Sequence, residues 1–158
     1  EGTAAGSAEA AVAAVLDAMH SAASNGDAER YFALWASDGV FIGTDPAERW
    51  PRDEFEAYAR ARFANGDGWS YAVRSRHVSL APSGVAWFDE SLLNDKLGSC
   101  RGVGVLVWDT EDAGWRISQY ALSMSIPNDA ALEVASRVRQ IPHDRFRSTG
   151  RDDVRVLE

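Results

Sequence analysis

The sequence predicts a single α+β domain in which N-terminal helices cover one face of a long, curved, mostly antiparallel sheet. Helical patterns dominate the chain up to a strong turn near residue 65, and four segments rich in β-branched and aromatic residues follow. Because helices and strands are grouped instead of alternating, the pattern favours α+β over α/β architecture. The 158 residues suit one domain, and a curved sheet with helices on one side would enclose a cone-shaped cavity.

The N-terminal part predicts a loose tail over residues 1–7 and then two helices. Apolar side chains recur at helical spacing along one stripe of the first helix: Val12, Val15, Leu16, Met19 and Ala23. The sequence Ser24-Asn25-Gly26 indicates the end of this helix, and Asp27 is a suitable N-cap for the next. One face of the second helix carries Tyr31, Leu34 and Trp35.

A short strand over residues 40–42 and a polar loop come next. The charged and aromatic residues of that loop are Asp45, Glu48, Arg49 and Trp50. A strand that leads into a charged loop closed by a large aromatic residue is suited to forming the mouth of a pocket. Pro51 is tolerated in a first helical turn, so we expect a third helix from there to the Asn65-Gly66 turn.

Four long segments predict the strands of the sheet, over residues 69–81, 85–95, 99–110 and 114–126. The turns between them are short, and short loops join antiparallel neighbours. We expect a last helix over residues 130–139 and a C-terminal tail over residues 140–158, which leaves residues 8–139 as the domain. This half of the chain holds more tryptophans than one cavity needs, so we expect a second copy to cover the outer sheet face: Trp69, Trp87, Trp108 and Trp115.

Charge and composition exclude several classes of partner. The net charge of −8 argues against nucleic acid, which requires clustered Lys and Arg, and no apolar run approaches the ~18 residues of a membrane span. Cys100 is the only cysteine, which favours a reducing compartment, so we expect a cytoplasmic location. The chain starts at Glu1 and not at Met, so a removed export signal is also compatible with it.

Several stretches together resemble the SnoaL-like proteins of the nuclear transport factor 2-like superfamily. They are Tyr31-Phe32-Ala33-Leu34-Trp35, Phe41-Ile42-Gly43-Thr44-Asp45, Glu48-Arg49-Trp50, Gly68-Trp69, Ala86-Trp87-Phe88-Asp89-Glu90, Arg101-Gly102-Val103-Gly104-Val105-Leu106, Gly114-Trp115-Arg116-Ile117 and Ile126-Pro127-Asn128-Asp129. The resemblance spans about residues 8–139. It implies a cone-shaped fold, a deep pocket between sheet and helices and frequent homodimers, but no single activity. Relatives often carry His or Asn where this chain has Ala121.

Three acids are candidates for proton transfer. Asp89 and Glu90 are adjacent on a strand, so alternation places one on each face. Phe88, Glu90 and Leu92 share the face that we expect to look inward, where burial would raise the pKa of a carboxyl group; the alternative is an ordinary ion pair with a neighbouring strand. Asp45 would gate the cavity, or else its side chain would hold a turn by bonding to nearby backbone.

A second group of residues is expected to bind a ligand or support its binding. Arg101 opens a strand from which it could reach Glu90 diagonally, and we expect the two to pair. The alternative for Arg101 is direct contact with an anionic ligand. The remaining candidates for the cavity lining are Trp35, Phe41, Trp50, Tyr58, Phe88 and Gln119.

The sequence shows no recognisable cofactor or metal site, so we expect neither. His20, His77 and His143 have no metal-ligand spacing, and His77 is expected to be a packed or surface strand residue. Dinucleotide and phosphate-loop motifs are absent. The leading functional prediction is a pocket that binds a small apolar or aromatic molecule, with cofactor-free isomerase, cyclase or dehydratase chemistry if the protein is an enzyme.

The alternative function is a non-catalytic ligand-binding or protein-association module. Two or more polar groups that converge inside the pocket would favour the enzyme. An interior of aromatic and aliphatic side chains alone would favour the binding module.

Overall fold

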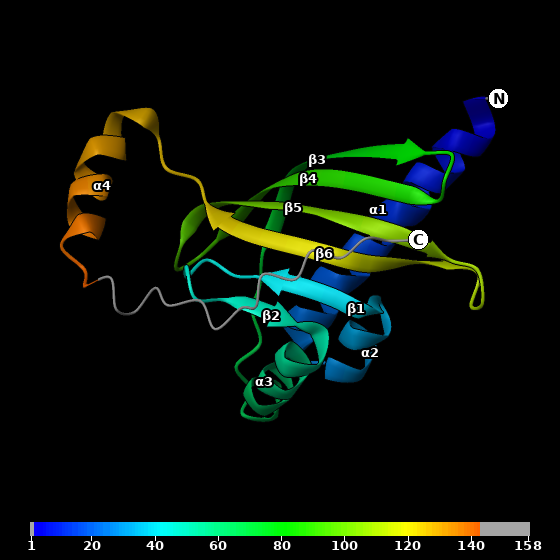
Figure 1. Ribbon diagram of the computed structural model, residues 1–158, viewed down its shortest axis with the longest axis horizontal. Coiled ribbons are helices and arrows are strands. Elements are labelled where there is room, and N and C mark those ends of the chain that lie inside the picture. The colour runs from blue at the N-terminus through cyan, green and yellow to red at the C-terminus, as the bar shows by residue number, and fades with distance from the viewer. Residues whose placement is uncertain (1, 143–158) are drawn as a thin grey trace.

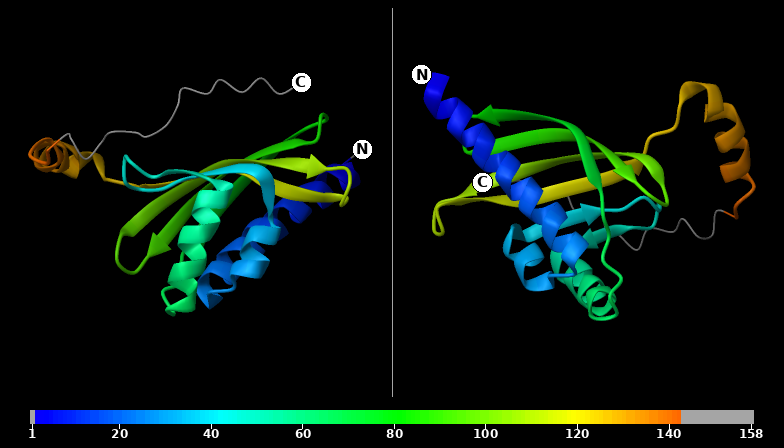
Figure 2. Two further views of the ribbon diagram at one scale, coloured as in Figure 1. Left: turned by 60° about the horizontal axis from the view of Figure 1, so that its bottom comes forward. Right: turned by 180° about the vertical axis from the view of Figure 1, so that it is seen from behind.

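A six-stranded sheet with three helices against one face forms the body of the protein (Figures 1 and 2). The structure is a computed structural model that describes residues 2–142. Helices α1 (Gly2–Asn25), α2 (Ala28–Ala33) and α3 (Arg52–Ala64) lie on the same side of the sheet, and no described helix is long and apolar enough to cross a membrane. The predicted α+β class is confirmed.

The sheet has the strand order β2-β1-β6-β5-β4-β3, and only β1 and β6 run parallel. The strands are β1 (Trp35–Ile42), β2 (Arg49–Pro51), β3 (Ala72–Ala81), β4 (Val85–Asn94), β5 (Gly98–Asp109) and β6 (Gly114–Met124). The last four agree closely with the segments expected from β-branched and aromatic composition. Their antiparallel pairing is also confirmed.

The prediction was wrong at the start of β1 and in the following loop. Helix α2 ends at Ala33, and Trp35 belongs to β1, where it pairs with Ile117 of β6. The amide of Ile117 donates a 2.9 Å hydrogen bond to the carbonyl of Leu34, so pairing with a distant strand overrides the local helical pattern. The expected polar loop ends in the short strand β2, in which Trp50 pairs with Phe41.

The two ends of the chain compare differently with the expectations from the sequence. Helix α1 begins at Gly2, so residues 2–7 are helical where a loose tail was expected; their alanines favour a helix. The expected last helix is confirmed as η1 (Asn128–Ala130) and α4 (Ala131–Arg139), which buries no side chain and stands away from the sheet in Figure 1. The tail predicted over residues 140–158 lies almost wholly outside the described residues, and the domain limits of 8–139 stay a prediction.

The core fills the space between the helices and the inner face of the sheet. The apolar stripe of α1 is buried there against aromatic side chains of α2 and α3 and the inward residues of β4, β5 and β6. Alternation along the strands leaves the other residues on the opposite face, which we call the outer face. Of the four tryptophans noted in the sheet-forming half of the chain, only Trp87 is found on the outer face; Trp69 and Trp115 belong to the helix side, and Trp108 lies beside Trp115 near the start of α1.

Candidate functional site

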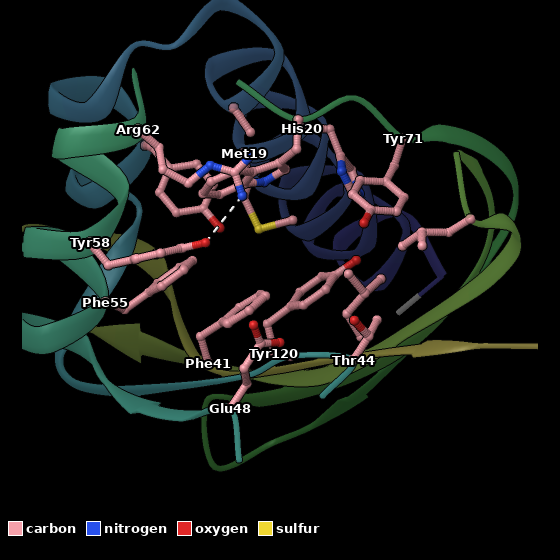
Figure 3. A pocket seen from close by; sticks show the side chains of 16 residues that line it. Met19, His20, Phe41, Thr44, Glu48, Phe55, Tyr58, Arg62, Tyr71 and Tyr120 are labelled. Carbon is pink, nitrogen blue, oxygen red and sulfur yellow. Dashed lines mark hydrogen bonds between the residues drawn. The ribbon is translucent and has the colours of Figure 1, made fainter. Parts of the chain in front are cut away.

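A half-open pocket of about 200 Å³ lies between α1, α3 and the inner face of the sheet (Figure 3). Ligand pockets usually combine apolar walls with a few polar groups that fix orientation. The aromatic and aliphatic lining comes from Met19, Ala23, Tyr31, Phe41, Phe55, Tyr58, Trp69, Leu97 and Leu122. The other lining residues are His20, Gly43, Thr44, Glu48, Arg62, Tyr71 and Tyr120.

Glu90 lies beneath this pocket and is the only charged residue of the described chain that is fully buried, with 0% of its surface exposed. Its Oε2 accepts hydrogen bonds from His20 Nε2 at 2.9 Å and from the Tyr120 hydroxyl at 3.0 Å. Its Oε1 accepts a 2.7 Å hydrogen bond from Arg76 Nε. Both carboxylate oxygens are therefore occupied, as a buried charge requires.

The backbone makes room for this cluster at Gly102 of β5. A β-carbon at that position would collide with the Tyr120 ring and hydroxyl and would lie 3.2 Å from Glu90 Oε2. Glu90 and Gly102 are direct partners across β4 and β5, and Tyr120 lies on the next strand. Glycine at this position therefore lets the phenol lie flat over β5 and reach the carboxylate.

The charges around Glu90 keep it ionised. Burial alone would raise the pKa of its carboxyl group, but the hydrogen bond and charge of His20, followed by those of Arg76, outweigh burial and lower that pKa below its ordinary value. Burial and the neighbouring Glu90 carboxylate raise the pKa of Tyr120, so its phenol stays protonated and donates. Arg76 is anchored in turn by Asp17, at 2.8 Å, and by the carbonyl of Ala13.

The bond between His20 and Glu90 defines the tautomer of the imidazole. An ionised carboxylate can only accept, so the proton between them belongs to Nε2. In the neutral ring, Nδ1 then keeps a lone pair, and it makes no hydrogen bond within residues 2–142. His20 is 12% exposed and lines the pocket, so it is the base best placed to meet a ligand there.

Four of the residues predicted for the site lie at or directly beneath the pocket. Phe41 and Tyr58 line it, and the Phe41 ring stacks on Phe55 with centroids 4.2 Å apart. Glu90 faces inward together with Phe88 and Leu92, as strand alternation predicted. Phe88 itself lies beneath the lining, with its ring 5.6 Å from that of Tyr120.

Three others face away from the pocket, and the expectation that they line it was wrong. Asp89 lies on the outer face, where it contacts His77 at 3.2 Å; His77 is the surface strand residue that was expected. Arg101 pairs with Ser91 and Ser123, and Gln119 with Val105, so all are outer-face positions. Successive side chains of a strand point to opposite faces of the sheet. Glu90 and Tyr120 point inward, so their neighbours in the sequence point outward. The expected pair between Glu90 and Arg101 is therefore absent, and Arg76 is the partner.

The remaining three predicted residues were also expected at the pocket, but they do not line it. Trp35 is buried in the core beside Tyr31 and Phe55. Trp50 is half-buried behind Tyr58, on which it stacks at 5.1 Å. Asp45 is exposed, and its Oδ1 accepts a 2.9 Å hydrogen bond from the Ala47 amide, which matches the turn alternative.

Sequence reasoning missed His20, Arg76, Tyr120 and Arg62 as site residues, although two of them left a signal. His20 lies four residues after Leu16, so it is a polar residue beside the apolar stripe of α1. The short hairpin turn after Ala81 pairs Ala81 with Val85, and counting outward along both strands pairs Arg76 with Glu90. Within residues 2–142 no group of three or more His, Cys, Asp or Glu residues could hold a metal ion.

Comparisons with known proteins agree with this architecture. A protein with a cystatin-like fold from Nostoc punctiforme is 16% identical with a TM-score of 0.65, over 86% of this chain and 88% of its own. A candidate dehydratase of the nuclear transport factor 2-like family from Streptomyces avermitilis is 21% identical with a TM-score of 0.59, over 77% and 98%. A candidate scytalone dehydratase from Novosphingobium aromaticivorans is 13% identical with a TM-score of 0.61, over 73% and 83%.

At these identities the solved structures establish the fold alone, which is the cone-shaped nuclear transport factor 2-like fold that the sequence predicts. No curated protein matches the chain. The SnoaL-like domain, however, matches residues 12–127. That match covers most of the chain, including every residue that lines the pocket. The protein therefore belongs to the SnoaL-like domain family.

Proposed function

We propose that the protein binds a small, largely aromatic molecule in the pocket and transfers a proton on it without a cofactor, as an isomerase, cyclase or dehydratase would. The observation that carries this proposal is the hydrogen-bonded pair of His20 and Glu90 at the pocket wall. The polar groups of His20 and Tyr71 lie together there, and Arg62 lines the end of the pocket away from Tyr71 (Figure 3). This meets the criterion that favours an enzyme over a purely apolar binding site.

The residues divide the work in a simple way. His20 Nδ1 accepts a proton from the ligand, and Glu90 holds the ring in place and stabilises the imidazolium that forms. Arg76 and Tyr120 occupy the remaining acceptor positions of Glu90 and keep it from taking the proton itself. A histidine oriented by a buried carboxylate is a recurrent general base in enzymes.

Tyr71 is the candidate for stabilising charge that develops on the ligand. Its hydroxyl makes no hydrogen bond within the described part of the chain, and the residue lines the pocket beside His20, with ring centroids 6.5 Å apart. Burial, followed by the nearby Cys100 and Glu48, raises the pKa of its phenol, so the group stays protonated. A neutral phenol can donate to an oxygen that gains negative charge as His20 removes a proton.

The alternative is a ligand-binding or protein-association module without chemistry. Most of the pocket wall is aromatic or aliphatic, and this feature is shared by binders and enzymes. Two proteins of similar fold are candidate dehydratases, which is compatible with proton transfer in this pocket.

The test is proton abstraction from 5-nitrobenzisoxazole, a small aromatic carbon acid. A base removes its ring C–H proton, the N–O bond breaks, and a coloured cyanophenolate forms without any other reactant. We expect the native protein to accelerate this reaction, and His20→Gln to lower the rate by about 100-fold, the low end for a general base. His77→Gln removes an exposed histidine from the outer face and should leave the rate unchanged.

Two results would reject the enzyme. One is no acceleration above free imidazole at equal concentration, and the other is an equal rate for the native protein and a folded His20→Gln variant. Either result would favour the non-catalytic ligand-binding or protein-association module.

A further inference from the structure

Arg62 is a cation in the pocket without an anionic partner. It lies in the last turn of α3, and it forms no ion pair with any acid of residues 2–142. In contrast, the α3 neighbours Arg52 and Arg60 both bind Glu56. Figure 3 shows Arg62 and Tyr58 at one end of the pocket and Tyr71 at the other.

Two aromatic rings and a hydroxyl hold the Arg62 guanidinium in place. Its Cζ lies 5.8 Å from the centroid of the Tyr58 ring and 5.7 Å from that of Trp69. Nη1 donates a 3.1 Å hydrogen bond to the Tyr58 hydroxyl. A guanidinium has five N–H donors in its plane, so most of them remain available after this contact. Stacking on rings orients the plane while its edge stays open.

The other charge of the pocket does not neutralise Arg62. Glu48 also lines the pocket, but its Oε2 accepts the amide of Asp45 at 3.2 Å and forms no ion pair with Arg62. Both charges act on Tyr71, whose phenol pKa Glu48 raises and Arg62 lowers. At Tyr71 the effect of Glu48 is the larger of the two, so an anionic ligand group is favoured beside Arg62 and not at the Tyr71 end of the cavity.

We propose that the pocket takes a small planar aromatic acid, with its ring among the aromatic side chains and its carboxylate bound by the open edge of Arg62. Two parallel N–H···O bonds are the geometry in which guanidinium and carboxylate fit best. The volume of about 200 Å³ suits a ligand of this size, since an apolar cavity of about 150 Å³ holds benzene. The inference rests on the proposed function for the pocket and adds the class of ligand.

The experiment measures binding alone, by isothermal titration calorimetry with 2-naphthoate and its neutral counterpart 2-naphthamide. The variants are Arg62→Gln, and Arg62→Met, which keeps the aliphatic stem over the rings. Arg60→Gln is the matched control, since it removes the same charge from the exposed side of the same helix. Thermal melting of each variant confirms that it is folded.

We expect the native protein to bind 2-naphthoate at least about tenfold more tightly than 2-naphthamide, as a charge-assisted hydrogen-bonded pair provides. Both Arg62 variants should lose this preference, and Arg60→Gln should keep it. Equal affinity of the native protein for the two probes, or a preference that survives in both Arg62 variants, overturns the assignment of an acid but leaves the pocket as a ligand site. If neither probe binds, the ligand pocket itself is refuted, and the assignment falls with it.

Discussion

Arg76 and Glu90 face each other across β3 and β4, with Arg76 Nε 2.7 Å from Glu90 Oε1 and Nη2 only 2.6 Å from the same oxygen. The Arg76 side chain is 11% exposed, and the carboxylate is fully buried. The same carboxylate holds His20 through its other oxygen. The orientation of the proposed base therefore depends on an ion pair that links two strands.

This pair should dominate the response of the fold to mutation. Removing one partner leaves a buried charge uncompensated, so Glu90→Gln and Arg76→Gln should each cost about 3–5 kcal/mol of unfolding free energy. The double variant should cost clearly less than the sum. Urea titrations of the four proteins give the coupling energy. Arg101→Gln is the control on the outer face and should change stability by less than about 0.5 kcal/mol; additive losses, or a large loss for Arg101→Gln, would rule out the pair.

The lowered pKa of Glu90 predicts how stability depends on pH. The pKa of Glu90 in the folded protein lies below the ordinary 4.5. As the pH falls, the unfolded chain therefore binds a proton at this position before the folded chain does. The stability that Glu90 contributes is therefore complete above about pH 4.5 and declines as the pH falls through the folded pKa. The difference in unfolding free energy between the native protein and Glu90→Gln should shrink as the pH falls below about 4.5. A difference that stays constant or grows would show that the carboxylate is not stabilised by His20 and Arg76.

Trp50 should act through Tyr58. Because Trp50 stacks behind this lining residue and is only half-buried, Trp50→Ala should weaken binding of 2-naphthoate. Trp50→Ala should destabilise the fold by less than the ~3–5 kcal/mol expected when a core aromatic side chain is removed. Phe55→Ala provides the reference value for a core aromatic residue in the same protein. Calorimetry and denaturation measure the two effects. Equal destabilisation by both variants would make Trp50 a core residue.

The outer face should pair with a second copy of the chain. Trp87 is 48% exposed there and lies near Val103, which is also exposed. Sedimentation at micromolar concentration should give about twice the 17.2 kDa chain mass, and Val103→Lys should shift it to the monomer. Leu132→Lys on α4 is the control. A monomeric native protein would contradict the dimer, and dissociation by Leu132→Lys alone would move the interface to α4.

Local patterns in the sequence were enough to predict the sheet and the inward position of Glu90. Turn residues separate the four long strands, and the period of two assigns Glu90 and Asp89 to opposite faces. The same reasoning could have identified Arg76, because the short hairpin between β3 and β4 sets their register. It instead favoured Arg101, which alternation places on the outer face.

Local patterns in the sequence could not predict contacts between distant parts of the chain. Trp35 lies in a strand because it pairs with Ile117 of β6, not because of its immediate neighbours. His20 and Glu90 are 70 positions apart in the sequence. They meet only because α1 packs across the sheet next to Glu90. The depth and angle at which a helix packs on a sheet depend on the whole core, so no spacing within α1 could have predicted this bond.

Nitrogen-15 NMR shows which ring nitrogen of His20 carries the proton, with His20→Gln to assign the signals and the exposed His77 as an internal reference. At about pH 9, where imidazole side chains are neutral, we expect the proton on Nε2 and a free lone pair on Nδ1. Glu90→Gln should weaken this preference because it removes the carboxylate that fixes the tautomer. A ring protonated on Nδ1 in the native protein would rule out His20 as the proposed base, since Nδ1 would then have no lone pair to offer a ligand.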